Sequence, residues 1–170
     1  MDILRYIFCD WQRNRGNPKG RILLIAFRIA SIAARYQAWR SPAWFFFLPY
    51  LLLYRIMVEW ILNVEIPYKT KIGPGLRLFH GAALVINDNA TIGANVTLRH
   101  CTTIGEKKEG GICPNIGDGV DIGSNSVVLG DILVGDESVI GAGSTVIHSF
   151  ESGSILAGNP ARIIRTIDRK

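Results

Sequence analysis

Three histidines are the residues of this chain whose chemistry and spacing first point to a reaction. His80, His100 and His148 each follow an aliphatic residue by two positions. A neutral imidazole can take a proton from an attacking hydroxyl near neutral pH, and it is also a common zinc ligand. The three side chains are therefore candidates for a general base or for a metal site. A single exposed histidine usually has neither role. The secondary-structure elements that carry these residues must therefore show whether any of the three is placed for catalysis or metal binding.

An aliphatic residue recurs every six positions over long stretches of residues 66–146. A helix would require recurrences at three and four positions, and an ordinary strand would alternate, so this period fits neither alone. It is typical of a parallel β-helix, in which each six-residue unit forms one side of a prism and turns its aliphatic side chain inward. A β-sandwich with regular turns is the alternative. The positions are Ile66, Ile72, Leu78 and Leu84; then Ile86, Ile92, Leu98 and Ile104; then Ile116, Ile122, Val128, Val134, Ile140 and Val146.

In such a prism the histidines fall where the chain turns a corner, so their side chains should face solvent or a neighbour. His80 and His100 are separated by one coil of about eighteen residues plus a shift of two, which should stack them on one face. The polar, Gly-rich segment 105–115 lacks an aliphatic residue at its expected middle position. We expect it to form a loop that leaves the prism close to the two histidines.

The pattern divides the chain into three parts. Residues 1–64 show helical spacing of apolar residues, residues 65–160 form the β-helix with the extruded loop 105–115, and residues 161–170 form a C-terminal tail. The expected fold class is therefore mainly β, with an N-terminal α-helical region. A length of 170 residues suits this arrangement, and a formal net charge of +5 is too diffuse to indicate nucleic-acid binding.

An aromatic and aliphatic run covers residues 43–54. It is too short to cross a bilayer, which requires roughly twenty apolar residues. Two interpretations remain open. The run can pack between subunits or against the end of the prism, or it can rest on the cytoplasmic leaflet with help from Arg35, Arg40, Arg55 and the basic segment 13–21.

The cysteines and the N-terminus indicate a compartment. Cys9, Cys101 and Cys113 are odd in number and lack metal-ligand spacing, which indicates a reduced, cytoplasmic setting. No signal peptide is recognisable, because acidic and basic residues interrupt the first positions. A peripheral location at the inner face of the plasma membrane would follow from the lipid-contact interpretation of the aromatic run.

Three segments match a known family in the order and type of their residues: Lys71-Ile-Gly-Pro-Gly-Leu-Arg-Leu-Phe-His-Gly81, Val96-Thr-Leu-Arg-His-Cys-Thr-Thr-Ile-Gly105 and Ala157-Gly-Asn-Pro-Ala-Arg162. They resemble the hexapeptide-repeat acyltransferases, and within them the serine O-acetyltransferase branch with its relatives that acetylate exopolysaccharides such as colanic acid. The segments Asp10-Trp-Gln-Arg-Asn-Arg15 and Tyr54-Arg55 extend the resemblance to most of the chain. It implies a left-handed parallel β-helix and a homotrimer with active sites between adjacent prisms.

The resemblance also implies a mechanism. His80 matches the family's catalytic base for direct acyl transfer, and Glu65 stands where serine acetyltransferases carry the aspartate that orients this base. A carboxylate on one ring nitrogen fixes the tautomer and stabilises the imidazolium that forms in the transition state. The donor would be acetyl-CoA, with no metal required.

Acetyl-CoA is expected in the groove between two prisms. Gly123, Ala142 and Gly158 would let its pantetheine arm approach the backbone, and Arg162 would meet its phosphates. Further basic candidates for the phosphates are Arg165, Lys170, Lys107 and Lys108.

The acceptor is where this sequence departs from serine acetyltransferases. Their loop carries an Arg-His pair before a proline, whereas Ile112 and Cys113 precede Pro114 here. Losing a guanidinium and an imidazole removes natural partners of a carboxylate, which disfavours serine. A sugar hydroxyl in capsular, exopolysaccharide or O-antigen biosynthesis, on an acceptor that can be lipid-linked, is then expected. Acceptor contacts would come from Asp10, which matches an N-terminal aspartate of the family, and from His100 and Cys113.

Other functions stay open at this stage. One is serine O-acetyltransferase activity in cysteine biosynthesis. Another is a trimeric scaffold without acyl transfer, or a zinc hydratase in which His80 and His100 supply two ligands. Trp11, Tyr68 and Phe79 are candidates for stacking on a sugar ring, although aromatic residues more often serve packing.

Overall fold

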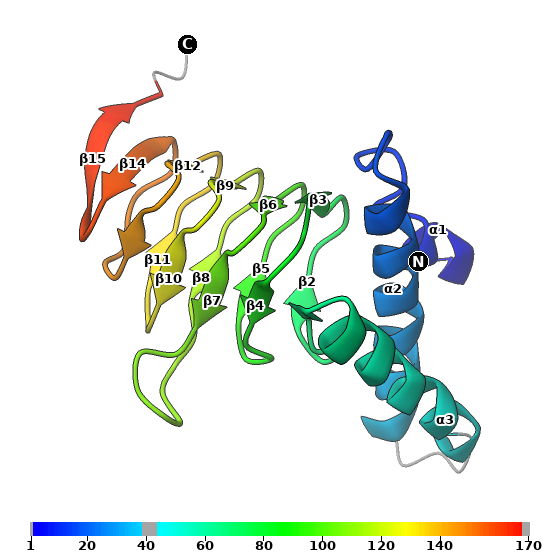
Figure 1. The fold of residues 1–170 in the computed structure, drawn as a ribbon. Helices are drawn as coiled ribbons and strands as arrows, with labels where there is room; N and C mark the ends of the chain where they lie inside the picture. Colours follow the sequence, from blue (N-terminus) through cyan, green and yellow to red (C-terminus); the bar gives the residue numbers. More distant parts are fainter. Residues whose placement is uncertain (1, 39–43, 168–170) are drawn as a thin grey trace.

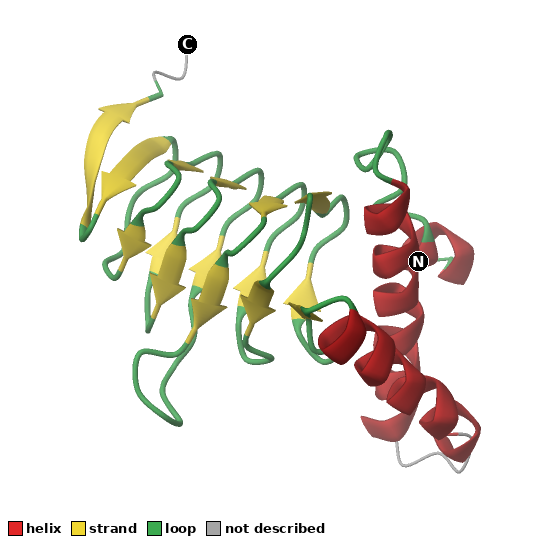
Figure 2. Cartoon of the chain, viewed as in Figure 1, coloured by secondary structure: helices red, strands yellow, loops and turns green. Residues whose placement is uncertain are grey.

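Short parallel strands wind into a prism, with helices at its N-terminal end (Figures 1 and 2). The computed structural model describes residues 2–38 and 44–167. Each coil adds one strand to each of three sheets, and neighbouring strands of adjacent coils pair in parallel. The first sheet contains β1 (Val64–Glu65), β4 (Leu84–Ile86), β7 (Thr103–Gly105), β10 (Val127–Leu129) and β13 (Thr145–Val146). The second contains β2 (Lys71–Ile72), β5 (Thr91–Ile92), β8 (Asn115–Ile116) and β11 (Leu133–Val134).

The third sheet carries the corners that matter for function. It contains β3 (Arg77–Phe79), β6 (Thr97–Arg99), β9 (Asp121–Ile122), β12 (Val139–Ile140), β14 (Ser154–Gly158) and β15 (Ala161–Thr166). The register pairs Leu78 with Leu98 and Leu98 with Ile122. The aliphatic residues of successive coils therefore stay aligned in spite of the two-residue shift after Leu84 and the loop 105–115.

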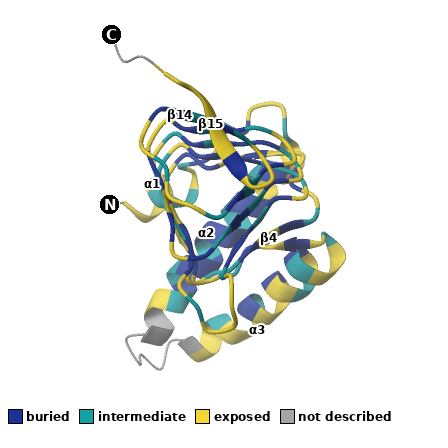
Figure 3. Ribbon diagram, turned by 90° about the vertical axis from the view of Figure 1, so that its left-hand side faces the viewer, coloured by how far each residue is buried: buried dark blue, intermediate teal, exposed yellow. Residues whose placement is uncertain are grey.

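The repeating aliphatic residues form the core of the prism, as the six-residue period predicts. All of them are buried except Ile72, which is partly buried in the first coil. Full burial of such a side chain stabilises a fold by about 1.5–3 kcal/mol. Figure 3 shows the buried residues inside the coils and the exposed ones on the outer surface. The prediction of a parallel β-helix is therefore confirmed.

The helical region closes the first coil of the prism. It consists of α1 (Ile3–Ile7), α2 (Pro18–Ala38), α3 (Trp44–Tyr54) and a π-helical continuation, η1 (Arg55–Ile61). Pro18 suits the first position of α2 because its missing N–H needs no partner there. The Asn17 side chain accepts a hydrogen bond from the Gly20 N–H at 3.0 Å and so caps the helix. Leu24 and Phe27 lie on the buried face of α2.

The aromatic run 43–54 corresponds largely to α3, which packs beside α2. Its inner side buries Leu51 and Tyr54, and the Tyr54 hydroxyl donates to the Ile66 carbonyl at 2.7 Å. The inner side of α3 thus packs against the end of the prism, which was one of the two interpretations of the aromatic run. Its other side is exposed, with Phe46 at 87%. In the described ranges, none of the helices combines the length and the apolar composition needed to cross a bilayer.

The C-terminal part differs from the expected tail. Residues Ala161–Thr166 form β15, which pairs antiparallel with β14 and covers an edge that would otherwise be open. Ala161 is buried in this hairpin. Lys170 and Arg40, named above as candidate phosphate and lipid contacts, lie outside the described residues.

Candidate functional site

One edge of the prism brings most of the expected site residues into a line. The edge is the corner that follows each strand of the third sheet, and successive coils place equivalent residues one above the other. From the helical end, the residues along it are Phe79 and His80, Arg99 and His100, Gly123 and Ser124, Gly141 and Ala142, and Ala157 and Gly158. The sequence predicts these residues separately, and the coil register explains why they share one edge.

His80 and His100 are neighbours on this edge, as predicted. Their ring centroids lie 6.1 Å apart and their planes meet at 69°. Phe79 packs edge-on against His80, with 4.9 Å between the centroids. His80 is exposed, and neither of its ring nitrogens bonds to another described residue. Its imidazole is therefore open to solvent at the prism edge.

The backbone at His80 is strained. Its φ angle is +70°, in the left-handed region that costs a non-glycine residue about 1–2 kcal/mol. Gly81 follows with φ +52°, so the chain turns sharply at this corner. The same left-handed conformation occurs at other turns of the prism, such as Asn95 and Asn125, so it belongs to the coil geometry. Here it presents the imidazole at the prism edge instead of continuing β3.

The turn between α1 and α2 holds β3, the strand that leads to His80. The Asn14 side chain donates to the Leu76 carbonyl at 2.8 Å and accepts from the Leu78 N–H at 3.0 Å. The Asn17 side chain donates to the Leu78 carbonyl at 2.8 Å. These bonds satisfy the outer edge of β3, which has no further strand beside it. They also bring residues 13–17 next to His80.

A hollow of about 220 Å³ lies between this turn and β3. Arg13, Arg15 and Arg77 line it together with Phe79 and His80. The sequence-based interpretation missed this arrangement, because it considered the basic segment 13–21 only as a possible lipid contact. The spacing of Arg13 and Arg15 around Asn14 was the available signal, but only the bonds of Asn14 to β3 place them beside His80.

Asp10, whose contact with the acceptor stays a prediction, is engaged by the fold in the single chain. It is 3% exposed and accepts two hydrogen bonds from Arg28, at 2.8 and 3.0 Å, and one from the Leu76 N–H at 2.8 Å. Arg28 is fully buried and also donates to the carbonyls of Ile72 and Gly73. Burial opposes the charge of Arg28, but its bonds to Asp10 outweigh this and raise its pKa. Both carboxylate oxygens are thus engaged in the fold.

Glu65 lies away from His80 in the single chain. It is in β1 of the first sheet and lines a different pocket, together with Arg55, Glu59 and Asp88. Its carboxylate forms no hydrogen bond or ion pair with any described residue. The pairing of Glu65 with His80 therefore stays a prediction.

The loop leaves the prism at a different corner from the histidines. It connects β7 of the first sheet to β8 of the second, and Figure 1 shows it extending away from the coils. The expectation that it lies close to His80 and His100 is therefore wrong for one chain, because these histidines follow strands of the third sheet. Cys113 is 7% exposed, and burial, helped by Glu106 and Asp88, raises the pKa of its thiol. Ile112 beside it is exposed.

The expected cofactor residues continue along the edge beyond His100. A Cβ on Gly123 would clash with the backbone of Ala142, so only glycine permits this close packing of coils. Ala142 and Gly158 are exposed and small, which leaves this part of the edge open along the backbone. Arg162 pairs with Ala157 in the terminal hairpin and is exposed beside this end of the edge. The geometry fits an extended ligand with an anionic end.

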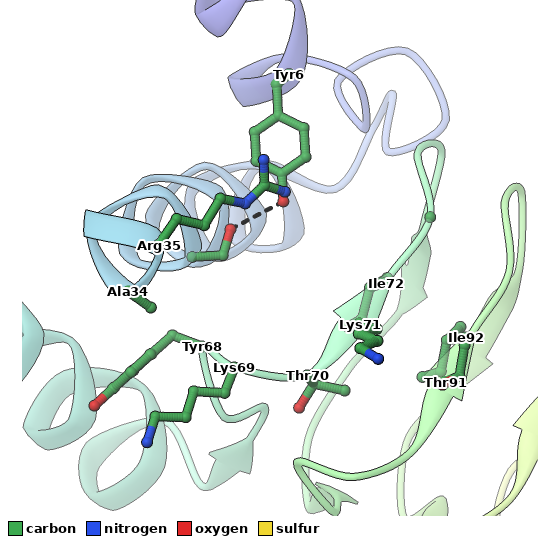
Figure 4. A pocket seen from close by; sticks show the side chains of 12 residues that line it. Tyr6, Ala34, Arg35, Tyr68, Lys69, Thr70, Lys71, Ile72, Thr91 and Ile92 are labelled. Atoms are coloured by element: carbon green, nitrogen blue, oxygen red, sulfur yellow. Dashed lines mark hydrogen bonds between the residues drawn. The ribbon is translucent and has the colours of Figure 1, made fainter. Parts of the chain in front are cut away.

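Another pocket, of about 500 Å³, lies elsewhere, between α2 and the first coil (Figure 4). Tyr6 and Arg35 lie on its helical side, and Tyr68 and Lys71 on its prism side. It contains neither histidine. Of the three aromatic candidates for sugar stacking, Tyr68 lies here and Trp11 packs under Arg21, so only Phe79 lies beside His80.

A metal centre finds no support in the residues that the structure describes. No group of three or more His, Cys, Asp or Glu side chains among them could hold a metal ion. His148 is exposed and follows β13 of the first sheet, so it does not join His80 and His100 at their corner.

Comparison with known proteins decides the family. None of the protein-family models compared with the chain matches it. The chain is 34% identical over 155 residues, which are 91% of its length and 96% of the relative's, to a protein of Escherichia coli (strain K12) named "Putative colanic acid biosynthesis acetyltransferase WcaB". The chain belongs to this acetyltransferase family.

Serine acetyltransferases are relatives of the same family. "Serine acetyltransferase 4" of Arabidopsis thaliana is 33% identical over 154 residues, 89% of this acetyltransferase but 41% of that protein. The solved structure of soybean serine acetyltransferase complexed with serine has a TM-score of 0.80 and 29% identity, covering 95% of this chain and 69% of that one. The serine acetyltransferase of Brucella abortus strain S19 in complex with coenzyme A has a TM-score of 0.79 and 27% identity, covering 98% and 69%. The expected hexapeptide-repeat acyltransferase fold is thus confirmed.

Proposed function

We propose that this acetyltransferase moves an acetyl group from acetyl-CoA to a hydroxyl group of a carbohydrate in capsular, exopolysaccharide or O-antigen biosynthesis. The observation that carries the proposal is its likeness to WcaB, which extends over 96% of that relative. Serine acetyltransferase 4 is matched over only 41% of its length. The presence of Ile112 and Cys113 before Pro114 adds support, since neither side chain can pair with the carboxylate of an amino acid as a guanidinium or imidazole would.

His80 acts in this proposal as the general base. A hydroxyl is a weak nucleophile at neutral pH, and an imidazole within hydrogen-bond reach can take its proton as the oxygen attacks the thioester carbonyl. The imidazolium of His80 then returns the proton to the sulfur as the carbon–sulfur bond breaks. The products are the acetyl ester and free thiol, so no acyl-enzyme is needed. Exposure of His80 and its lack of a partner among described residues suit this exchange.

Acetyl-CoA would lie along the prism edge, with its thioester at His80 and its phosphates toward the terminal hairpin. Ala142 and Gly158 are small and exposed and leave room for the pantetheine arm, Gly123 lets the coils beneath it pack closely, and Arg162 offers a cation to the phosphates. His100 lies between the two parts of the edge, within reach of the acceptor or the thioester. Glu65 would orient His80, and Cys113 would contact the acceptor, if assembly brings these side chains to the edge.

A homotrimer is part of the same proposal, because an edge of one prism is a groove only when a second prism stands beside it. Exposed apolar side chains on the outer faces, such as Val85 on β4 and Leu133 on β11, support association. Light scattering on the purified protein should give three times the mass of the 18.8 kDa chain. A monomer at working concentration would contradict the shared groove.

The exposed side of α3 and η1 is proposed to rest on a membrane surface that carries a lipid-linked acceptor. Phe46, Leu52 and Trp60 are at least 60% exposed on these two elements, and several exposed apolar side chains on adjoining helices suggest an interaction surface. The protein should therefore float with anionic vesicles and should lose this binding in Leu52→Ser with Trp60→Ser. If the double variant instead changes the oligomeric mass and vesicles never bind, packing between subunits explains the patch.

A second candidate is serine O-acetyltransferase activity, which the likeness to the serine acetyltransferases favours. One experiment separates the two. Thiol release from acetyl-CoA is measured with de-acetylated host polysaccharide and, separately, with L-serine, for the wild type and for His80→Ala. Turnover with polysaccharide alone, lost in the variant, is the expected result; turnover with L-serine would overturn the carbohydrate assignment.

A further inference from the structure

Three arginines line the hollow beside His80 without a carboxylate among the lining residues to balance them. Arg13, Arg15 and Arg77 line it, and no acidic side chain does. Ion pairs among the described residues engage Arg28, Arg55 and Arg99, but none of these three. Like charges gathered in one recess repel each other, so a fold tolerates such a cluster most readily where an anion binds it.

Two of the three arginines are held by side-chain contacts, and the third is placed by the turn that carries it. The Nη2 group of Arg13 donates to the Thr97 hydroxyl at 3.1 Å, which ties it to the next coil. The guanidinium carbon of Arg77 lies 5.2 Å from the centroid of the Phe79 ring, a distance at which cation and ring attract. Arg15 is exposed on the turn that Asn14 and Asn17 bind to β3. The hollow is therefore positioned by the fold.

Arg99, at the same edge, is an arginine whose charge is neutralised by an ion pair. It lies 5.7 Å from the centroid of Phe79 and forms an ion pair with Asp121 one coil further on. The equivalent residue one coil earlier is Phe79, and Arg77 has no such partner. Positive charge is thus neutralised on the cofactor side of His80 and left unpaired on its helical side.

The position of the hollow indicates which substrate fills it. His80 itself lines the hollow, so a bound group there lies close to the reacting atoms. The proposed path of acetyl-CoA runs from His80 in the opposite direction, past Gly123 and Ala142. Its pantetheine arm also keeps its phosphates far from the thioester that must reach His80. The acceptor is then the substrate that meets the arginines.

We infer that the acceptor carries an anionic group, a carboxylate or a phosphate, near the hydroxyl that receives the acetyl group, and that Arg13, Arg15 and Arg77 bind this anion. The inference rests on the proposed function and names its substrate class, an acidic carbohydrate. Guanidinium groups suit both anions because their paired N–H donors match two oxygens at once. A volume of about 220 Å³ accommodates one such group with part of a sugar ring.

Binding of simple sugars to the full-length protein tests this directly. Calorimetry compares D-glucuronate and D-glucose 1-phosphate with neutral D-glucose, for the wild type, Arg15→Gln, Arg77→Gln and the control Arg5→Gln. Arg15 and Arg77 are exposed, so their variants should fold, and Arg5 is an exposed arginine outside the hollow. We expect at least one anionic sugar to bind about tenfold or more tightly than glucose, and Arg77→Gln and Arg15→Gln to remove most of that difference. Arg5→Gln should leave it intact.

The outcomes separate this inference from the proposed function. Equal binding of all three sugars, or a preference for anions that survives both substitutions, overturns the inference. Which of the two anionic sugars binds distinguishes a carboxylate from a phosphate. Thiol release with L-serine that depends on Arg77 would keep the anion site but overturn the carbohydrate assignment, since serine also carries a carboxylate. Release with neutral polysaccharide that ignores Arg77 would keep the proposed function and overturn the anion site.

Discussion

His80 and His100 occupy equivalent corners of successive coils, with 6.1 Å between their ring centroids. Only one of them needs to be the base. His80 lines the hollow with the unpaired arginines, whereas Nδ1 of His100 is buried without a partner among the described residues. This asymmetry supports our proposal that His80 transfers the proton and that His100 positions a substrate.

Substituting the three histidines should therefore give three different results. His80→Ala should lower kcat by about 10²–10⁴-fold, the usual contribution of a general base. His100→Ala should act mainly on KM, and His148→Ala, far from this edge, should leave both constants unchanged. Steady-state kinetics with acetyl-CoA measure all three. A larger loss of kcat in His100→Ala than in His80→Ala would reverse the assignment.

Glu65 can be tested as the residue that positions His80. If assembly brings the two together, Glu65→Gln should lower kcat by roughly 10–100-fold, the cost of removing a supporting hydrogen-bond partner, and should distort the pH profile of kcat. Asp88→Asn is the matched control, because Asp88 lines the same pocket as Glu65. Equal, small effects of both substitutions would show that Glu65 has no part in catalysis.

The buried pair of Asp10 and Arg28 should dominate the stability of the helical end. Removing one partner leaves an uncompensated buried charge, so Asp10→Asn should lower the free energy of unfolding by about 3–5 kcal/mol. The ion pair between Arg55, which is 60% exposed, and the partly buried Glu59 is the control, and Arg55→Gln should cost no more than about 1 kcal/mol. Urea unfolding at equal protomer concentration compares the two variants. Similar costs would mean that Asp10 is not the anchor inferred here.

Ala142 tests the proposed path of acetyl-CoA. A leucine there would project from the exposed edge into the space of the pantetheine arm, so Ala142→Leu should raise the KM for acetyl-CoA by about tenfold or more. Asn89→Leu, at an exposed turn on another corner, should not change this constant. If Ala142→Leu binds acetyl-CoA as the wild type does, the cofactor follows another route.

Cys101 at the prism corner and Cys113 in the loop should react with thiol reagents at different rates. Cys101 is exposed, whereas burial raises the pKa of Cys113 and limits access to it. At pH 7.5, Ellman's reagent should label Cys101 first, and Cys101→Ser should remove the fast phase. Fast labelling of Cys113 in Cys101→Ser would contradict its burial.

The raised pKa of Cys113 also links stability to pH. Because the folded state holds the Cys113 proton more tightly than the unfolded state, this thiol stabilises the fold below its ordinary pKa of 9.0, and the stabilisation is lost as the pH rises above that value.

Much of the fold could be predicted from local pattern. A six-residue aliphatic period specifies a prism because each side needs one inward residue, and the breaks in that period after Leu84 and Ile104 mark a shift and a loop that the structure contains. The proximity of His80 and His100 follows from counting coils. Repeats of this kind contact only their neighbours, so sequence distance translates into spatial distance.

The sequence alone therefore determined the β-helix, the edge with its two histidines, and the departure of Ile112 and Cys113 from the serine acetyltransferase pattern. Only the tertiary structure showed what Asp10 contacts and where the turn with Arg13 and Arg15 lies. Asp10 and Arg28 pair within the helical region, and both bind backbone groups of the first coil. Arg13 and Arg15 lie beside His80 because Asn14 binds β3. No repeat period connects these segments, since their pairing depends on how the helices dock on the first coil. Side chains that come together only when the helices dock on the first coil leave no periodic signal in the sequence. The positive charge of the hollow could therefore be recognised only once the fold had placed Arg13, Arg15 and Arg77.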